Sequence, residues 1–219
     1  MNLLHSTFIN TDKRWAFVFI CLLSGLLTYL AQSFFVTEEL FYYSLGEQVA
    51  IERFEKLWAE SQRWQWVTYL ILPILYLVKF TLVSFCIVTG ALLANVKIGF
   101  KRVFQVVLVA EAVFFLPIIL RLAWFTFVQT DYTLSDLQYF MPLSLANLFD
   151  VKHLEIWWVY PFQLANLFEV AYWLLLAYGL HLHTQKEYES MLRLVLSSYG
   201  SGLLLWVVLV MFLNVNFSH

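Results

Sequence analysis

Five long apolar runs constrain the fold of this 219-residue chain more than any other feature. A helix needs about 20 apolar residues to cross the hydrocarbon core of a bilayer. The runs that we expect to form spans cover about residues 15–35, 64–94, 103–128, 155–182 and 191–213. The sequence therefore predicts an all-α fold, a polytopic membrane helix bundle in which residues 1–219 form a single transmembrane domain.

The composition agrees with a membrane protein and argues against other classes. Apolar residues make up 62% of the chain and charged residues 13%, about half the charged share of a soluble domain. The net charge of −2 gives no reason to expect a nucleic-acid partner. Cys21 and Cys86 both fall in apolar runs, so we interpret them as small packing residues and expect neither a disulfide nor a metal site.

The basic residues predict an orientation in the membrane. Lys and Arg gather in the short segments on one side of the expected spans, which in most membrane proteins is the cytoplasmic side. These residues are Lys13, Arg14, Lys97, Lys101, Arg102, Lys186 and Arg193. The segments on the other side are longer and acidic. We expect the N-terminus in the cytoplasm and the C-terminus outside, in a plasma membrane, most simply a bacterial inner membrane.

Two segments between the expected spans have an amphipathic pattern. In residues 46–61, Leu57 and Trp58 can share an apolar helical face, which predicts an interfacial helix on the outer side. Residues 142–150 have a similar pattern, and Pro142 suits a first helical turn. We expect a second short interfacial helix there.

A short sequence occurs twice. PLSLANLFDV at 142–151 recurs as PFQLANLFEV at 161–170, with seven of ten positions identical. The flanking residues 132–141 and 151–160 share little, so we interpret the repeat as coincidence or local convergence. Its second copy falls inside an expected span.

An intramembrane polar network is expected within the spans. Its members are Lys79, Glu111, Arg121, Gln163, Asn166 and Glu169. A charge at the bilayer centre costs at least about 2.5 kcal/mol, so such side chains face the bundle interior and seek partners. We expect a central ion pair between Lys79 and either Glu169 or Glu111.

The amide residues of the network lie on the fourth expected span. Gln163, Asn166 and Glu169 are spaced by three, which places them on one stripe of a continuous helix. Their amides could hydrogen-bond to Arg121. Such a network either fixes which helix packs on which or conducts protons, ions or lipid headgroups.

The sequence contains no motif of an intramembrane enzyme. There is no HExxH, and His181 and His183 are two residues apart, on different faces of a helix. The small residues of YGSGL at 199–203 favour close helix packing. No Walker A loop is present, and the apolar runs lack the paired broken helices of secondary transporters. We therefore expect no enzyme, no catalytic residue, no cofactor and no metal.

The stretch from about residue 77 to 214 resembles the Yip family. The resemblance rests on GALLANVKIGFKRVFQVVLVAEAVFFLPIILRL at 90–122, PLSL at 142–145 and LFEVAYWLLLAYGL at 167–180. The matching positions are Gly90, Phe100, Lys101 and Pro117. Yip proteins are five-span membrane proteins first met as partners of Rab GTPases, so the resemblance implies five spans, a cytoplasmic N-terminus and a bacterial relative of that family.

Two functions remain open from the sequence. The first is a non-enzymatic scaffold or accessory subunit that binds other membrane proteins or itself, with residues 46–61 and 97–102 as contact surfaces. The second is a permease-like transport subunit in which Lys79, Glu111 and Glu169 line a polar path. The lipid bilayer is a partner in both.

Overall fold

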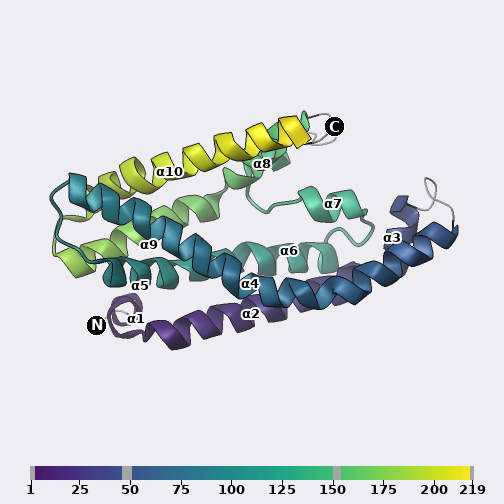
Figure 1. The fold of residues 1–219 in the computed structure, drawn as a ribbon, viewed down its shortest axis with the longest axis horizontal. Coiled ribbons are helices and arrows are strands. Elements are labelled where there is room, and N and C mark those ends of the chain that lie inside the picture. Colours follow the sequence, from purple (N-terminus) through teal and green to yellow (C-terminus); the bar gives the residue numbers. More distant parts are fainter. Residues whose placement is uncertain (1–2, 46–50, 150–153, 218–219) are drawn as a thin grey trace.

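A computed structural model describes residues 3–45, 51–149 and 154–217 of the chain, and helices account for most of them (Figure 1). In chain order these are α1 (Leu3–Asn10), α2 (Lys13–Phe35), α3 (Glu38–Leu45), α4 (Ile51–Leu93), α5 (Phe100–Ala110), the 3-10 helix η1 (Glu111–Phe114), α6 (Phe115–Phe127), α7 (Leu134–Tyr139), the 3-10 helix η2 (Leu145–Leu148), α8 (Ile156–Leu164), α9 (Leu167–Thr184) and α10 (Tyr188–Phe217). The predicted all-α class is confirmed.

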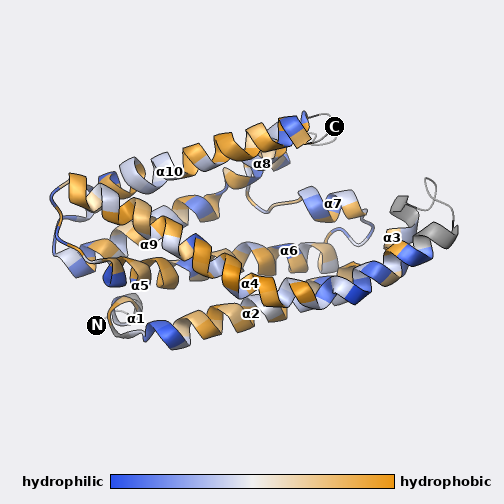
Figure 2. Ribbon diagram, in the orientation of Figure 1, coloured by the Kyte–Doolittle hydropathy of each residue, from blue (hydrophilic) through white to orange (hydrophobic). Residues whose placement is uncertain are grey.

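Four helical segments of the described chain are long and apolar enough to cross a membrane. They cover residues 13–35, 55–93, 100–127 and 188–217. These segments overlap the first, second, third and fifth expected spans. The fourth expected span, 155–182, is divided between α8 and α9. Figure 2 shows the long helices as mostly hydrophobic along their middles, as the bilayer interior requires.

The long helix α4 corrects one expected interfacial helix. It runs without a break from Ile51 to Leu93, with Pro73 inside it. Residues 51–61 are therefore the first turns of the second span and not a separate helix, while residues 46–50 lie outside the described residues. No glycine or proline occurs between residues 51 and 72, and extending a helix is easier than nucleating a new one.

The second expected interfacial helix is also replaced. Residues 142–149 contain only the 3-10 turn η2 instead of a helix over 142–150, and residue 150 lies outside the described residues. The Leu145 N–H donates to the Ala165 carbonyl at 2.9 Å. Because the Leu145 N–H is bonded to residue 165, it cannot form a helical hydrogen bond within its own segment. The same bond links this segment to the fourth expected span.

The third span changes its helix type in the middle. Between α5 and α6 the chain forms η1, which begins at Glu111. Pro117 lies three residues beyond η1, has no N–H, and its ring would clash with the carbonyl four residues earlier, at Val113, in a regular α-helix. The tighter turn of η1 relieves this clash and presents Glu111 to the bundle interior, where the residue is 2% exposed.

The two ends of the bundle differ. The connections 94–99 and 185–187 lie at one end together with α1, while α3 and α7 lie at the other (Figure 1). We call these the α1 end and the α7 end. The main hydrophobic core extends from the α1 end to the middle of the bundle and includes Phe8, Phe80, Leu176 and Val195. A second cluster, built on Phe35, Phe125 and Leu137, occupies the α7 end.

Small residues let α4 and α10 approach closely, as the sequence predicted for 199–203. A methyl group on Gly202 would lie 2.8 Å from the Cys86 sulfur, and one on Gly90 would meet the Ser198 side chain. Close backbone approach of this kind is how helices associate in lipid, where hydrophobic burial gives no drive. The contact fixes α10 against α4 beside the polar residues described next.

Candidate functional site

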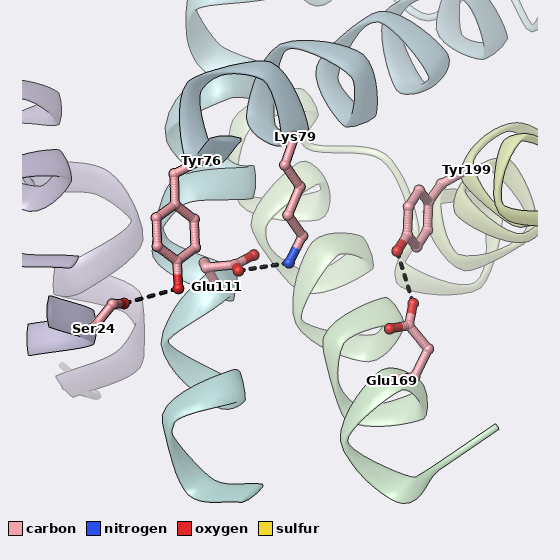
Figure 3. Close-up of polar contacts among 6 residues, drawn as sticks. All are labelled: Ser24, Tyr76, Lys79, Glu111, Glu169 and Tyr199. Carbon is pink, nitrogen blue, oxygen red and sulfur yellow. Dashed lines mark hydrogen bonds and ion pairs between the residues drawn. The ribbon is translucent and has the colours of Figure 1, made fainter. Parts of the chain in front are cut away.

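An ion pair joins the partly exposed Lys79 to the buried Glu111, whose side chains are 40% and 3% exposed. Lys79 Nζ lies 2.6 Å from Glu111 Oε1. The ammonium also lies 4.3 Å from the centre of the Phe114 ring, close enough for a cation–π contact. The structure thus pairs Lys79 with one of its two expected partners. Figure 3 shows Lys79 projecting from α4 between Glu111 and Glu169.

The second buried carboxylate, Glu169, has neutral partners. Tyr199 Oη from α10 donates a hydrogen bond to Glu169 Oε1 at 2.8 Å (Figure 3). Trp173 Nε1 donates to the same oxygen, also at 2.8 Å. Glu169 also lies in the first turn of α9, where the positive end of the helix dipole favours a carboxylate. No Lys or Arg of the described chain forms an ion pair with it.

Tyr172 packs against an aromatic neighbour of each carboxylate site. Its side chain is fully buried, and its ring lies 5.0 Å from Phe114 and 5.6 Å from Tyr199, centre to centre. Tyr172 Oη and Glu111 Oε2 are both buried without a hydrogen-bond partner among the described residues. We define the polar core as Lys79, Glu111, Glu169, Tyr172 and Tyr199.

The fourth expected span is broken just before Glu169. α8 ends at Leu164, α9 begins at Leu167, and Asn166 caps α9 by accepting the Glu169 N–H at 2.8 Å. The Asn166 amide also donates to the Gln163 and Leu164 carbonyls at 2.9 and 3.1 Å. One side chain therefore satisfies backbone groups on both sides of the break, which lipid could not do.

The two copies of the repeated sequence pair with each other at this break. Ser144 and Asn166 form an isolated antiparallel bridge. The Leu145 N–H donates to Ala165 at 2.9 Å, and the Leu167 N–H donates to Leu143 at 3.2 Å. The first copy thus supplies backbone partners that the interrupted span lacks, and α9 is held in place with Glu169 facing the interior.

Two expectations about the amide stripe are wrong. Gln163 lies in the last turn of α8 and donates to the Tyr139 carbonyl at 2.9 Å. Asn166 is the N-cap of α9, and Glu169 belongs to α9, so no continuous stripe exists. The expected bonds from these amides to Arg121 are absent because both amides are occupied by backbone. Arg121 is half-buried on α6 and makes no hydrogen bond or ion pair with any described residue.

Polar contacts also join α2 to the bundle beside the polar core. Ser24 and Tyr76 share a hydrogen bond of 2.8 Å (Figure 3). Farther toward the α7 end, Gln32 Oε1 accepts bonds from Gln65 at 2.7 Å and Tyr69 at 3.0 Å. Hydrogen bonds between apolar helices fix their register, so these contacts set how α2 packs against α4.

The α1 end holds a separate polar contact. Gln105 Nε2 donates to the carbonyls of Phe8 and Thr11 at 3.1 and 3.2 Å, and so caps the last turn of α1. His183 Nε2 donates to Phe8 at 3.3 Å. Burial lowers the pKa of His183, the bond to Phe8 opposes this, and the nearby positive charges of Arg102 and Lys13 lower the pKa further.

Sequence reasoning missed the aromatic members of the polar core. Tyr172 and Trp173 follow Glu169 by three and four residues, the spacing of one helical face, and this signal could have found them. Tyr199 is thirty residues from Glu169, on another helix, and no local pattern indicates the contact. Tyr76 comes shortly before Lys79 on α4, about one helical turn away, and could have been found by the same helical spacing.

Comparisons of the chain with protein-family models, curated proteins and solved structures found no match. The chemistry of the site therefore rests on its own residues. Two carboxyl groups, one ammonium group and two phenol hydroxyls are gathered inside a membrane bundle, beside the 3-10 turn η1 and the α8–α9 break. These groups can exchange protons. Among the described residues no cluster of three or more His, Cys, Asp or Glu could hold a metal ion.

Proposed function

We propose that the chain is a transport protein, or the transport subunit of a complex, in which the polar core is part of the path. The observation that carries this proposal is that a helix irregularity lies at each buried carboxylate. The third span changes from α-helix to the 3-10 turn η1 at Glu111, and the α8–α9 break lies just before Glu169. A broken helix at membrane depth is typical of substrate and ion sites in transporters.

A physical argument links such a break to function. Non-helical backbone in a membrane must be buried in protein or face a polar cavity, because lipid cannot satisfy it. Buried ionisable groups carry an additional cost. Bringing both features to one place costs more stability than an apolar bundle would, and a scaffold has no need of that arrangement.

The topology that we propose counts α8 and α9 together as a fifth span. α1, the start of α2 and the connections 94–99 and 185–187 then lie in the cytoplasm, because most Lys and Arg residues gather at that end. The C-terminus lies outside, and the membrane is a plasma membrane. Five spans and a cytoplasmic N-terminus also fit the Yip-like pattern of Gly90, Phe100, Lys101 and Pro117.

The test of the transport proposal is ion flux through purified protein in lipid vesicles. Glu169→Gln keeps the size of the side chain and removes its ability to ionise. We expect it to abolish flux while the amount of folded protein stays unchanged. Glu187→Gln, at an exposed position of the α1 end, is the matched control and should conduct normally. If Glu169→Gln lowers the folded yield and leaves flux per molecule intact, the polar core is structural.

A scaffold or accessory subunit is the second candidate, and α10 favours it. No residue of Ser201–Phe217 is buried, although Leu204 and Leu205 are 69% and 75% exposed apolar side chains. The second half of α10 is poorly covered by the rest of the chain, so another membrane protein or a second copy of this chain could pack against it. Purification from native membranes in mild detergent tests this: a stoichiometric partner supports the scaffold, and a chain that elutes alone contradicts it.

A further inference from the structure

The buried carboxylates of the polar core outnumber its cations by one. Lys79 neutralises Glu111 at 2.6 Å. Within residues 3–45, 51–149 and 154–217, the side-chain donors to the Glu169 carboxylate are the neutral groups of Trp173 and Tyr199. Glu111 and Glu169 are 2% and 6% exposed. An unbalanced charge inside a bilayer costs at least about 2.5 kcal/mol. The core is therefore neutral only when it holds one further positive charge.

The hydrogen-bond pattern of Glu169 indicates that the additional positive charge is a proton. Both donated bonds end on Oε1, which leaves Oε2 to carry a hydrogen, as in a neutral carboxylic acid. A hard metal cation instead needs several oxygen ligands around it. The described residues offer two carboxylates and isolated hydroxyls, and no three acidic, His or Cys side chains come together.

A second position for the proton lies on Glu111. Its Oε2 is buried and unpartnered, as is the hydroxyl of Tyr172. Buried polar atoms without a partner are rare and call for an explanation such as an unseen water or a transferable proton. Tyr172 packs edge-to-face on Tyr199, whose hydroxyl donates a hydrogen bond to Glu169. The residue with the unpartnered phenol is therefore a direct neighbour of a residue that binds Glu169.

We propose that the polar core binds one proton and exchanges it between Glu169 and Glu111, and that this proton is the species that moves along the path proposed above. The proton leaves Glu169 Oε2 and arrives on Glu111 Oε2. Neutral Glu111 then releases Lys79, which pairs with the newly ionised Glu169. Both states contain one ammonium, one carboxylate and one carboxylic acid, so the core stays neutral. The position of Lys79 between the two carboxyl groups in Figure 3 suits this exchange.

Other titratable groups surround the pair without adding charge at neutral pH. Those facing Glu111 or Glu169 from the packed helices, besides Lys79, are Tyr76 from α4, Tyr160 from α8, Tyr172 from α9 and Tyr199 from α10. Phenols are neutral up to about pH 10. The proton balance of the core is therefore set by Lys79 and the two carboxyl groups.

Infrared spectroscopy of the purified protein in lipid tests the exchange directly, because a protonated carboxyl has its own carbonyl band. At neutral pH we expect this band in the unaltered protein and in Glu187→Gln, and its loss in Glu169→Gln. Glu111→Gln should lose it as well, because the introduced amide cannot hold Lys79 as a carboxylate does, and Lys79 then ionises Glu169. Absence of the band from the unaltered protein, or its persistence in Glu111→Gln, overturns the proposal.

Proton uptake into vesicles separates this inference from the transport function on which it rests. With a trapped pH dye and a potassium diffusion potential, we expect uptake by the unaltered protein and by Glu187→Gln, and none beyond empty vesicles for Glu169→Gln. If another ion carries the current and the protonated carboxyl band is absent, the proton-exchange proposal is wrong and the transport proposal stands. If the infrared bands behave as expected but no ion crosses the membrane, the proton exchange between Glu169 and Glu111 is supported and the transport function is contradicted.

Discussion

Gly179 offers a sharp test of how α1 docks on the bundle. A methyl group at this position would lie 2.5 Å from Val106 Cγ1 and 2.8 Å from Phe8 Cε1. Both neighbours are buried, with 0% and 1% exposure. Neither side chain can swing into open space, so Gly179→Ala must displace α1 or distort the contact between α5 and α9.

The size of the effect follows from two opposing contributions. Alanine is favoured over glycine in a helix by about 1 kcal/mol. Overpacking a filled core costs about 1–3 kcal/mol. Gly25, on α2, has nothing within 4 Å of an added methyl group, so Gly25→Ala should keep the favourable contribution alone. The two variants should therefore differ by about 1–3 kcal/mol in unfolding free energy, or about 2–12 °C in midpoint for a chain of this size.

The assay is thermal unfolding in detergent, and the rate at which a thiol dye labels the two cysteines reports the unfolding. Cys21 and Cys86 are free and half-buried, so they react faster with a thiol dye once the bundle opens. Phe8→Ala combined with Gly179→Ala should lose less stability than the sum of the two single variants, because Phe8→Ala removes one of the two colliding side chains. Equal midpoints for Gly25→Ala and Gly179→Ala would refute the docking of α1 against α9.

Three further outcomes are expected. Lys79→Met leaves Glu111 buried without its cation and should destabilise the fold by about 3–5 kcal/mol, while Lys79→Met with Glu111→Leu recovers most of the monodisperse protein in gel filtration. Asn166→Ala removes the cap of α9 and should cost about 1 kcal/mol, seen as a lower unfolding midpoint. The pKa of His183 is lowered below its ordinary value of 6.5 by burial, so its contribution to stability is present above that pH and is lost as the pH falls through the folded-state pKa; His183→Gln should flatten this part of the midpoint–pH curve.

The four helices that are long enough to span a membrane were predictable because the bilayer sets the length and composition of a span. Apolar runs of about 20 residues leave few alternatives, and charged residues inside them must face the interior. Lys79 and Glu111 were found on this argument. The 3-10 turn at Glu111 has a local cause in Pro117, and the sequence indicates that cause directly.

The break at Asn166 was not predictable in the same way. Residues 162–170 contain neither glycine nor proline, and the pattern suits a continuous helix. The break persists because Leu143 and Leu145, in the first copy of the repeat, provide backbone hydrogen bonds that a helix would otherwise supply. Such a partner lies outside any local window, and the stripe expected for Gln163, Asn166 and Glu169 failed for this reason.

The repeated sequence now has a physical interpretation that differs from coincidence. In each copy the asparagine of LANLF donates its side-chain amide to a carbonyl upstream: Asn147 to Met141 at 2.8 Å and Asn166 to Gln163 at 2.9 Å. Each copy thus satisfies backbone groups in a part of the chain that is not α-helical, and the two copies pair at Ser144 and Asn166. Unsatisfied backbone in a membrane costs several kcal/mol, so two such segments that satisfy each other are more stable than either alone. Local convergence on one sequence is what that requirement favours.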